Sequence, residues 1–296
     1  MYCIIDIGSN TMRLSCYRVI DRQLTYVFHK KRMAGLASYV EENGNLLKKG
    51  LDKAIEILND FKKIIQSVGI DTVFIIATAS FRNVNNTQEI LTQIKDATDF
   101  DVEVLSGEEE AVYDFIGASH LTSSRDGIVV DIGGGSTEIV FYSDGIIEKA
   151  LSLPFGSLNL YSKKVAKLFP KKEEVHDIRK LIKDSLDKLA ITKDNQTILG
   201  VGGTNRAVCK LYNEYFGLPS DNKVMKCSKI TKMLHKIRED KRIALSYILQ
   251  IIPERIHTII PGMIIMDEIN KYYQCKDVEV SSWGVREGYL IQKLLN

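Results

Sequence analysis

The sequence has no apolar run long enough to form a membrane-spanning helix, and its five cysteines form no closely spaced pair. A spanning helix needs about 20 consecutive apolar residues, so a membrane partner or membrane protein is not expected. At the start of the chain no basic stretch precedes the apolar residues and Asp6 interrupts them, which predicts a strand rather than a signal peptide. The dispersed cysteines predict reduced thiols, no disulfide framework, no zinc site and a cytoplasmic location; they are Cys3, Cys16, Cys209, Cys227 and Cys275.

The sequence also lacks a strong charge of either sign, because its net charge is only +2 at pH 7. The average hides an asymmetry: residues 1–120 carry 13 basic and 17 acidic side chains, whereas residues 163–242 carry 20 and 10. A basic segment attracts anionic ligands, but a lysine-rich helix surface in water explains the same count. No helix-turn-helix, zinc-finger or RNP-type motif accompanies the lysines, so we expect no duplex nucleic acid as a partner.

Two segments of the chain follow the same formula. Residues 2–11 are an apolar run that ends at Asp6 and a Gly-Ser turn, and residues 128–137 are another that ends at Asp131 and a Gly-rich turn. Each is followed by a returning segment, which predicts a hairpin. A chain of 296 residues suits one large or two modest domains, so the repeat predicts two similar α/β lobes that face each other. We place the lobes at 1–120 and 121–296, with the last helix, 285–296, as a candidate to pack back on the first.

Hydrophobic periodicity predicts the remaining elements. Apolar residues at steps of three and four from Leu47 to Val68 indicate a helix that ends near Gly69. A strand over 71–78, a helix over 87–98 and a strand over 102–105 form a βαβ pattern. Further helices are expected over 108–119, 157–168, 173–190, 204–216, 228–239, across 241–272 and over 285–295, with strands over 197–201 and 278–280.

The two Asp-ended turns are the strongest candidates for a binding site. Tight glycine turns let backbone N–H groups converge on an anion, and nearby hydroxyls add donors. Asp6 and Asp131 could hold a divalent cation that neutralises phosphate oxygens. One such turn is explained as well by a plain hairpin, but two matching turns favour a site. The chain lacks the P-loop and GxGxxG motifs, so the usual NTPase and dinucleotide modes are not indicated.

Three further features could contribute to that site, and each has an ordinary structural alternative. Gly202-Gly203-Thr204 could cradle a phosphate at a helix start or simply connect a strand to a helix. The glutamates at 108–110 could supply a general base or only suit a helix dipole. Arg82 follows a strand end, where ligands bind in α/β sheets, or is a surface arginine. The histidines show no metal-ligand spacing.

Together these segments resemble the exopolyphosphatase/guanosine pentaphosphate phosphohydrolase family of the actin–Hsp70–sugar kinase superfamily. The resemblance extends along nearly the whole chain. It rests on residues 6–14 (DIGSNTMRL), 77–82 (ATASFR), 106–111 (SGEEEA), 129–140 (VVDIGGGSTEIV), 153–157 (LPFGS), 201–204 (VGGT), 261–262 (PG) and 281–290 (SSWGVREGYL). It implies two ribonuclease H-like lobes, as in the actin-like ATPase fold, with the active site in the cleft between them.

The resemblance also implies roles for individual residues. Glu110 falls on the family's catalytic glutamate, with Glu109 as the alternative if the register slips, and Arg82 falls on its phosphate-binding arginine. Its metal-linked carboxylates fall on Asp131 and Glu138. Its phosphate turns fall on Gly8, Ser9, Asn10 and Thr11 and on Gly133, Gly134, Gly135 and Ser136. Where the family often has Arg-Ala-Asp this chain has residues 255–257 (RIH), so a ligand role for that aspartate is not carried over.

The activity implied is release of orthophosphate from the end of inorganic polyphosphate, with Mg²⁺ or another divalent cation as cofactor. Hydrolysis of guanosine pentaphosphate is the first alternative. A sugar or acid kinase and a non-catalytic, nucleotide-sensing actin-like protein are the others. A homodimer is one candidate assembly.

Overall fold

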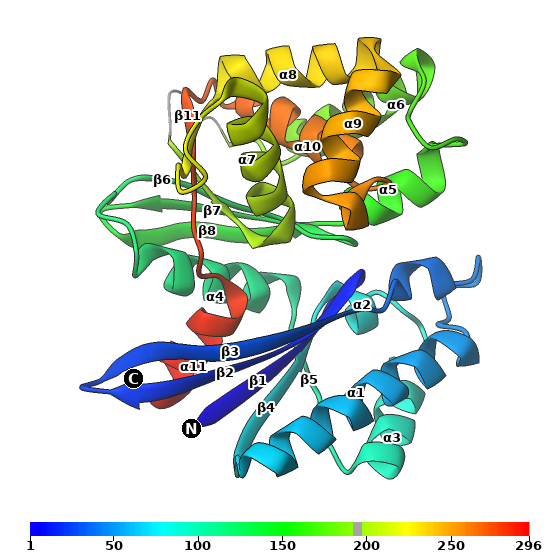
Figure 1. The fold of residues 1–296 in the computed structure, drawn as a ribbon, viewed down its shortest axis with the longest axis vertical. Helices are drawn as coiled ribbons and strands as arrows, with labels where there is room; N and C mark the ends of the chain where they lie inside the picture. The colour runs from blue at the N-terminus through cyan, green and yellow to red at the C-terminus, as the bar shows by residue number, and fades with distance from the viewer. Residues whose placement is uncertain (192–196, 296) are drawn as a thin grey trace.

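The computed structural model describes residues 1–191 and 197–295, which form two lobes, each built on one β-sheet (Figure 1). This arrangement confirms the predicted α/β class with two similar lobes. Asn296, the last residue of the predicted final helix, lies outside the described residues. Among the described residues, we find no helix with the length and apolar character needed to cross a membrane.

The first sheet has the strand order β3-β2-β1-β4-β5. β1, β2 and β3 pair as antiparallel neighbours, and β4 and β5 continue the sheet parallel to β1. The ends of β1 and β4 therefore meet at one edge, which brings the first glycine turn beside the short helix α2 (Ala79–Arg82). The strand bounds are Tyr2–Ile7, Thr11–Ile20, Gln23–Met33, Thr72–Ala77 and Glu103–Val104 for β1 to β5.

The second sheet has the order β10-β11-β9-β6-β7-β8 and repeats this design. β6, β7 and β8 form an antiparallel meander, and β9 pairs parallel with β6. The second and third glycine turns consequently lie at the same edge. The strand bounds are Gly127–Ile132, Thr137–Ser143, Ile146–Leu153, Ile198–Val201, Val224–Lys226 and Asp277–Val280 for β6 to β11.

Helices cover the outer face of each sheet. On the first sheet, α1 and α3 bury apolar side chains such as Phe61 and Ile90 against Ile5 and Leu14. On the second sheet, the larger core is closed by a layer of six helices (Figure 1). The bounds are Lys48–Val68 for α1, Thr87–Thr98 for α3, Ser157–Lys164 for α5, Lys172–Asp187 for α6, Gly202–Phe216 for α7, Cys227–Glu239 for α8, Lys241–Ile251 for α9 and Ile259–Tyr272 for α10.

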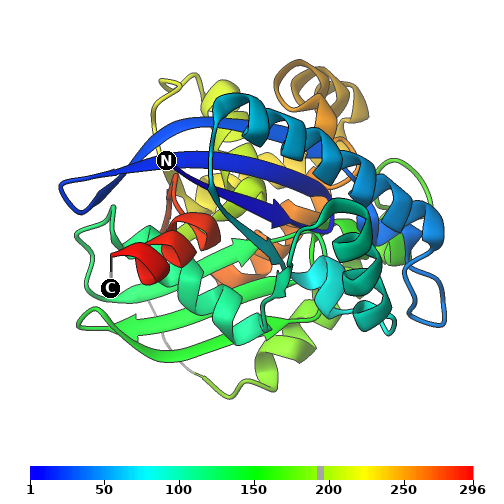
Figure 2. The same cartoon turned by 90° about the horizontal axis from the view of Figure 1, so that it is seen from below.

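Two helices between the sheets each pack against the sheet of the lobe to which they do not belong in sequence. α4 (Gly107–Ser119) packs Ala111 and Phe115 against β6 and β7 of the second sheet. α11 (Val285–Leu294), from the end of the chain, packs Leu290 against β1 and β4 of the first. The two helices lie side by side (Figure 2). They can approach so closely because Gly117 and Gly288 have no side chains: a Cβ on Gly117 would overlap the backbone of Gly284, just before α11, and one on Gly288 would overlap the Tyr113 carbonyl in α4.

The element predictions were close, with three kinds of difference. The helix expected over 157–168 ends at Lys164, and the helix expected over 173–190 ends at Asp187. β10 and the 3-10 helices η1 (Leu36–Tyr39) and η2 (Pro253–Arg255) were not predicted, because they are too short to show a hydrophobic period. α2 was not predicted either, so Arg82 ends a short helix instead of directly following β4.

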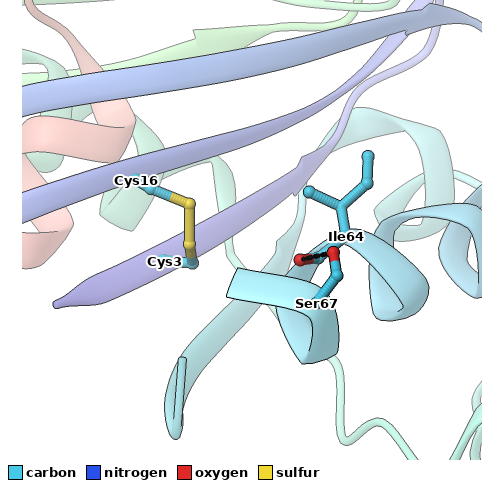
Figure 3. The surroundings of a disulfide bond; sticks show 4 residues. All are labelled: Cys3, Cys16, Ile64 and Ser67. Atoms are coloured by element: carbon cyan, nitrogen blue, oxygen red, sulfur yellow. Dashed lines mark hydrogen bonds between the residues drawn. A yellow bond between two sulfur atoms is a disulfide. The ribbon is translucent and has the colours of Figure 1, made fainter. Parts of the chain in front are cut away.

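The expectation that no cysteine forms a disulfide was wrong. Cys3 and Cys16 face each other across β1 and β2, with 4.2 Å between their Cα atoms, and are joined by a disulfide bond (Figure 3). Their separation of 13 residues hid the pair from a search for closely spaced cysteines. Cys209, Cys227 and Cys275 are free and buried.

Candidate active site

A cavity of about 900 Å³, including space open to solvent, lies between the lobes at the strand ends. All three glycine turns line it, together with Glu110, Asp6 and Asp131. The sequence-predicted residues Gly8, Ser9, Asn10, Thr11, Gly133, Gly134, Gly135, Ser136, Gly202, Gly203 and Thr204 are all among its walls. Arg82 and Glu138 are not among the residues that line the cavity; they lie behind Glu110.

The first two turns have the same construction. Each is closed by one backbone hydrogen bond of 3.0 Å, from Gly8 to Thr11 in the first lobe and from Gly133 to Ser136 in the second. The turns also touch across the cavity, because a Cβ on Gly135 would come within 2.7 Å of the Ser9 hydroxyl. The absence of side chains here is therefore what allows the two lobes to meet.

In both turns the carbonyl groups are bonded while amide groups remain unpaired. The carbonyl oxygens of Ser9 and Asn10 accept bonds from residues 34–37, and those of Gly133, Gly134 and Gly135 accept bonds from the start of α5. Within the described chain, no acceptor takes the amide hydrogens of Ser9, Asn10, Gly134, Gly135 or Ser136. Unpaired amides lining a cavity form an anion-binding concavity. The start of α7, at Gly202 and Gly203, adds the unpaired amides of a helix N-terminus.

Glu109 and Glu110 have different environments. Glu109 completes a capping box at the start of α4: it accepts from the Ser106 amide at 2.8 Å and is exposed. That bond holds the pKa of Glu109 below its usual value. Glu110 is buried and lines the cavity. Burial, followed by the charge of Glu138, raises the pKa of Glu110 well above the usual range, and Arg82 opposes this shift.

Arg82 ties Glu110 to the second lobe. One guanidinium nitrogen donates to Glu110 Oε2 at 2.7 Å and to the Leu105 carbonyl at 3.1 Å. The other reaches Glu138 Oε1 at 3.4 Å and the hydroxyls of Ser136 and Ser152 at 3.3 and 3.4 Å. With both terminal nitrogens engaged, Arg82 pairs with two buried carboxylates and fixes the position of Glu110.

Asp131 and Glu138 are paired across the β6–β7 hairpin; Glu138 is buried and Asp131 half-buried, with other carboxylates near both. Burial, and then the charge of Asp131, raises the pKa of Glu138 to about 7. Burial likewise raises the pKa of Asp131 to about 6, with Arg206 opposing the shift. Glu138 Oε1 accepts from Ser152 at 2.7 Å, but Oε2 has no partner.

These residues fit a hard divalent cation. The cluster offers carboxylate oxygens, one of them unpartnered, and Arg82 alone does not balance its charge. Among the described residues, no three His, Cys, Asp or Glu side chains are grouped as a preformed metal site. Mg²⁺ suits this situation, because proteins usually hold it by one or two carboxylates together with water and substrate phosphates.

The cavity is also lined by basic side chains that the sequence analysis did not single out; they are Arg13, Lys31, Arg206, Arg255 and Arg286. We call these five the cationic cluster. Burial, followed by the neighbouring charges of Arg286 and Arg206, lowers the pKa of Arg13 to about 10. Burial also lowers the pKa of Lys31, Arg206 and Arg255. Binding of a polyanion would reduce the repulsion among these crowded, partly desolvated cations.

Asp6 is engaged in this cationic cluster. Its carboxylate accepts from Arg286 at 3.0 Å, and both side chains are largely buried. Asp6 is therefore less available to a cation than Asp131 or Glu138, and its role as a metal ligand stays a prediction. Arg255 lines the cavity beside Gly203, which leaves no room for a Cβ at that glycine.

Comparisons with known proteins show which family the chain matches. The model of the Ppx/GppA phosphatase family matches residues 15–296. Exopolyphosphatase 1 of Mycobacterium tuberculosis is 25% identical over 308 residues, covering 98% of this chain and 87% of that protein. A guanosine-5'-triphosphate,3'-diphosphate pyrophosphatase of Pseudoalteromonas atlantica is 26% identical over 215 residues, covering 71% of this chain and 43% of that one.

The fold has a similar solved counterpart. The crystal structure of the Aquifex aeolicus member of the Ppx/GppA protein family superposes with a TM-score of 0.81 at 29% identity. The match covers 99% of this chain and 97% of that one. The two-lobe architecture is therefore shared over the full length of both.

Proposed function

The chain belongs to the Ppx/GppA phosphatase family, a family of phosphoric anhydride hydrolases, and on this premise we propose that it is a cation-dependent exopolyphosphatase. It would release orthophosphate from the end of inorganic polyphosphate. The observation that carries this proposal is the lining of one cavity, which brings together the buried base Glu110, the glycine turns and the five-residue cationic cluster.

The chain's own groups supply the elements of phosphoryl transfer, which depends mainly on positioning and charge neutralisation. The unpaired amides of the first two turns would bind the oxygens of the terminal phosphate. Glu110, held by Arg82, would orient a water and take its proton for in-line attack on phosphorus. The cationic cluster would bind the rest of the polyanion, which is the leaving group.

Asp131, which lines the cavity, is the carboxylate best placed to hold the cation, with Glu138 paired to it across the hairpin; the cation when bound would neutralise charge on the phosphate oxygens. Arg82 would support the same chemistry as a positioning residue, because it pairs with both Glu110 and Glu138 and reduces the repulsion between them.

Guanosine pentaphosphate is the second candidate substrate, because a relative named for that activity matches 71% of this chain. The same amides and base would act on its terminal phosphate. A kinase would need a hydroxyl acceptor, and a nucleotide-sensing protein would need no buried base; neither would release orthophosphate in the experiment below.

The test is orthophosphate release with Mg²⁺, comparing short polyphosphate, long polyphosphate, guanosine pentaphosphate and ATP, with Glu110→Gln as the blank. We expect release from polyphosphate that disappears in the variant. Preference for guanosine pentaphosphate would select the second substrate. Nucleotide binding without release from any compound would reject the enzyme.

A further inference from the structure

Asp114 is a buried carboxylate that none of the motifs discussed above includes. It follows Glu110 by one turn of α4, outside the 106–111 segment, and it lines the same cavity. Residues four apart lie on one face of a helix, so both carboxylates reach the cavity from α4. The residue is only 1% exposed.

No side chain among the described residues forms a hydrogen bond or ion pair with this carboxylate. Neither oxygen has a partner at normal hydrogen-bond geometry. Burial, and then the charges of Asp131, Glu110 and Glu138, raise the pKa of Asp114. A backbone hydrogen bond from the Val285 amide lowers it, but this effect is the smaller one. The charge of Asp114 raises the pKa of Arg206, but the hydrogen bond from Arg206 goes to the Ser281 carbonyl and not to Asp114.

The packing around Asp114 also holds it in place. A Cβ on Gly284 would come within 3.0 Å of Asp114 Oδ1, so the glycine before α11 makes room for the carboxylate. An unpartnered charge that is buried and fixed inside a cavity is unfavourable unless something positive joins it there.

We propose that Asp114 is a ligand of the divalent cation in this site, acting together with Asp131. The inference rests on the cation that the proposed function requires and adds one protein ligand to it. Asp114 lies against Gly284, whose Cβ position also meets Val201, and Asp131 lies against the next residue, Gly202, so both carboxylates lie at the same strand end. Two carboxylates, completed by water and phosphate oxygens, match the way Mg²⁺ is usually bound. They also agree with the finding that no group of three ligands is preformed among the described residues.

The experiment measures cation binding without substrate, so it does not depend on activity. Mn²⁺ is titrated into the full-length chain and its Asp114→Asn, Asp131→Asn and Glu108→Gln variants, followed by calorimetry or by the electron paramagnetic resonance of free Mn²⁺. Glu108 is the matched control, because it is an exposed acidic residue on the same helix. Melting temperatures in EDTA and in Mg²⁺ show that each variant folds.

We expect Asp114→Asn to weaken Mn²⁺ binding by about tenfold or more. Its melting temperature in EDTA should equal or exceed that of the wild type, because a buried charge is removed, and its gain on adding Mg²⁺ should be smaller. Glu108→Gln should match the wild type. If Asp131→Asn loses Mn²⁺ while Asp114→Asn binds it normally, Asp114 is not a ligand but the proposed cation site stands. If the wild type binds no Mn²⁺, both fail.

Discussion

Asp6 and Asp131 occupy equivalent positions in the two lobes, but the residue paired with each across its hairpin differs in charge. Asp6 is opposite Arg13, whereas Asp131 is opposite Glu138. The repeat therefore keeps the same backbone pattern in both lobes, but the first hairpin pairs an aspartate with an arginine and the second pairs two carboxylates. The predictions below test the roles of the carboxylates, of Arg82 and of the basic segment.

The first prediction concerns the base. Glu110→Gln should lower the turnover rate by about 10²- to 10⁴-fold, because the amide cannot accept the water's proton, while polyphosphate binding persists. Glu109→Gln is the control: glutamine can still complete the capping box, so its rate should stay near that of the wild type. Turnover and binding measured for both variants would decide between the residues, and the opposite ranking would reassign the base to Glu109.

The second prediction concerns the pH at which the base is active. Arg82 lowers the pKa of both Glu110 and Glu138, so Arg82→Gln should raise both values. Because only the ionised base works, the acidic limb of the rate profile should move to higher pH. Arg82→Lys keeps the charge and should move it less. Rates measured from pH 5 to pH 9 would show this, and profiles that coincide would mean that Arg82 does not tune the base.

The third prediction concerns stability without cation. The pKa of Glu138 is about 7 in the folded chain against 4.5 ordinarily, so between these values the folded state holds a proton that the unfolded state has released. The stability contributed by Glu138 is thus present below pH 4.5 and is lost as pH rises through 7. Urea unfolding in EDTA at pH 5 and pH 8 should show a smaller fall for Glu138→Gln than for the wild type. An equal fall would contradict the shift.

The fourth prediction concerns the basic segment beyond the cavity. α5 starts at the second glycine turn and ends in exposed lysines, so it leads away from the site. Changing Lys163, Lys164 and Lys167 to Gln should raise KM for long polyphosphate several-fold, reduce its salt dependence and leave short chains unaffected. Lys229, Lys232 and Lys236 on α8 are an equally exposed control set. Equal effects on long and short chains would mean that the 163–172 lysines only face solvent.

The sequence predicted the parts of the site that are local in the chain. The glycine turns, the hairpins and the placement of Glu110 beside a helix start each depend on fewer than about a dozen neighbouring residues. Arg206, Arg286 and Asp114 were missed because only the meeting of α4, α7 and α11 gives them a common cavity. No local pattern distinguishes them from ordinary helix residues.

The disulfide was a different kind of omission, since the signal was present. Once a hairpin is predicted around residues 8–11, its register pairs Ile7 with Met12 and, by counting outward, Cys3 with Cys16. Residues opposite each other on antiparallel strands are close enough for a disulfide. The separation of the two cysteines along the chain does not reveal the pair, whereas the register across the hairpin does.

The exchange of α4 and α11 between the sheets has a consequence for synthesis. The inner face of the first sheet, with Ile4, Tyr17 and Ile76, is covered by residues 285–291. During synthesis, this apolar surface of the first strands therefore stays uncovered until nearly all of the rest of the chain has emerged from the ribosome. A nascent chain halted after the second lobe's strands would present that surface to chaperones, and the first lobe would complete its burial only when its last-made helix arrives.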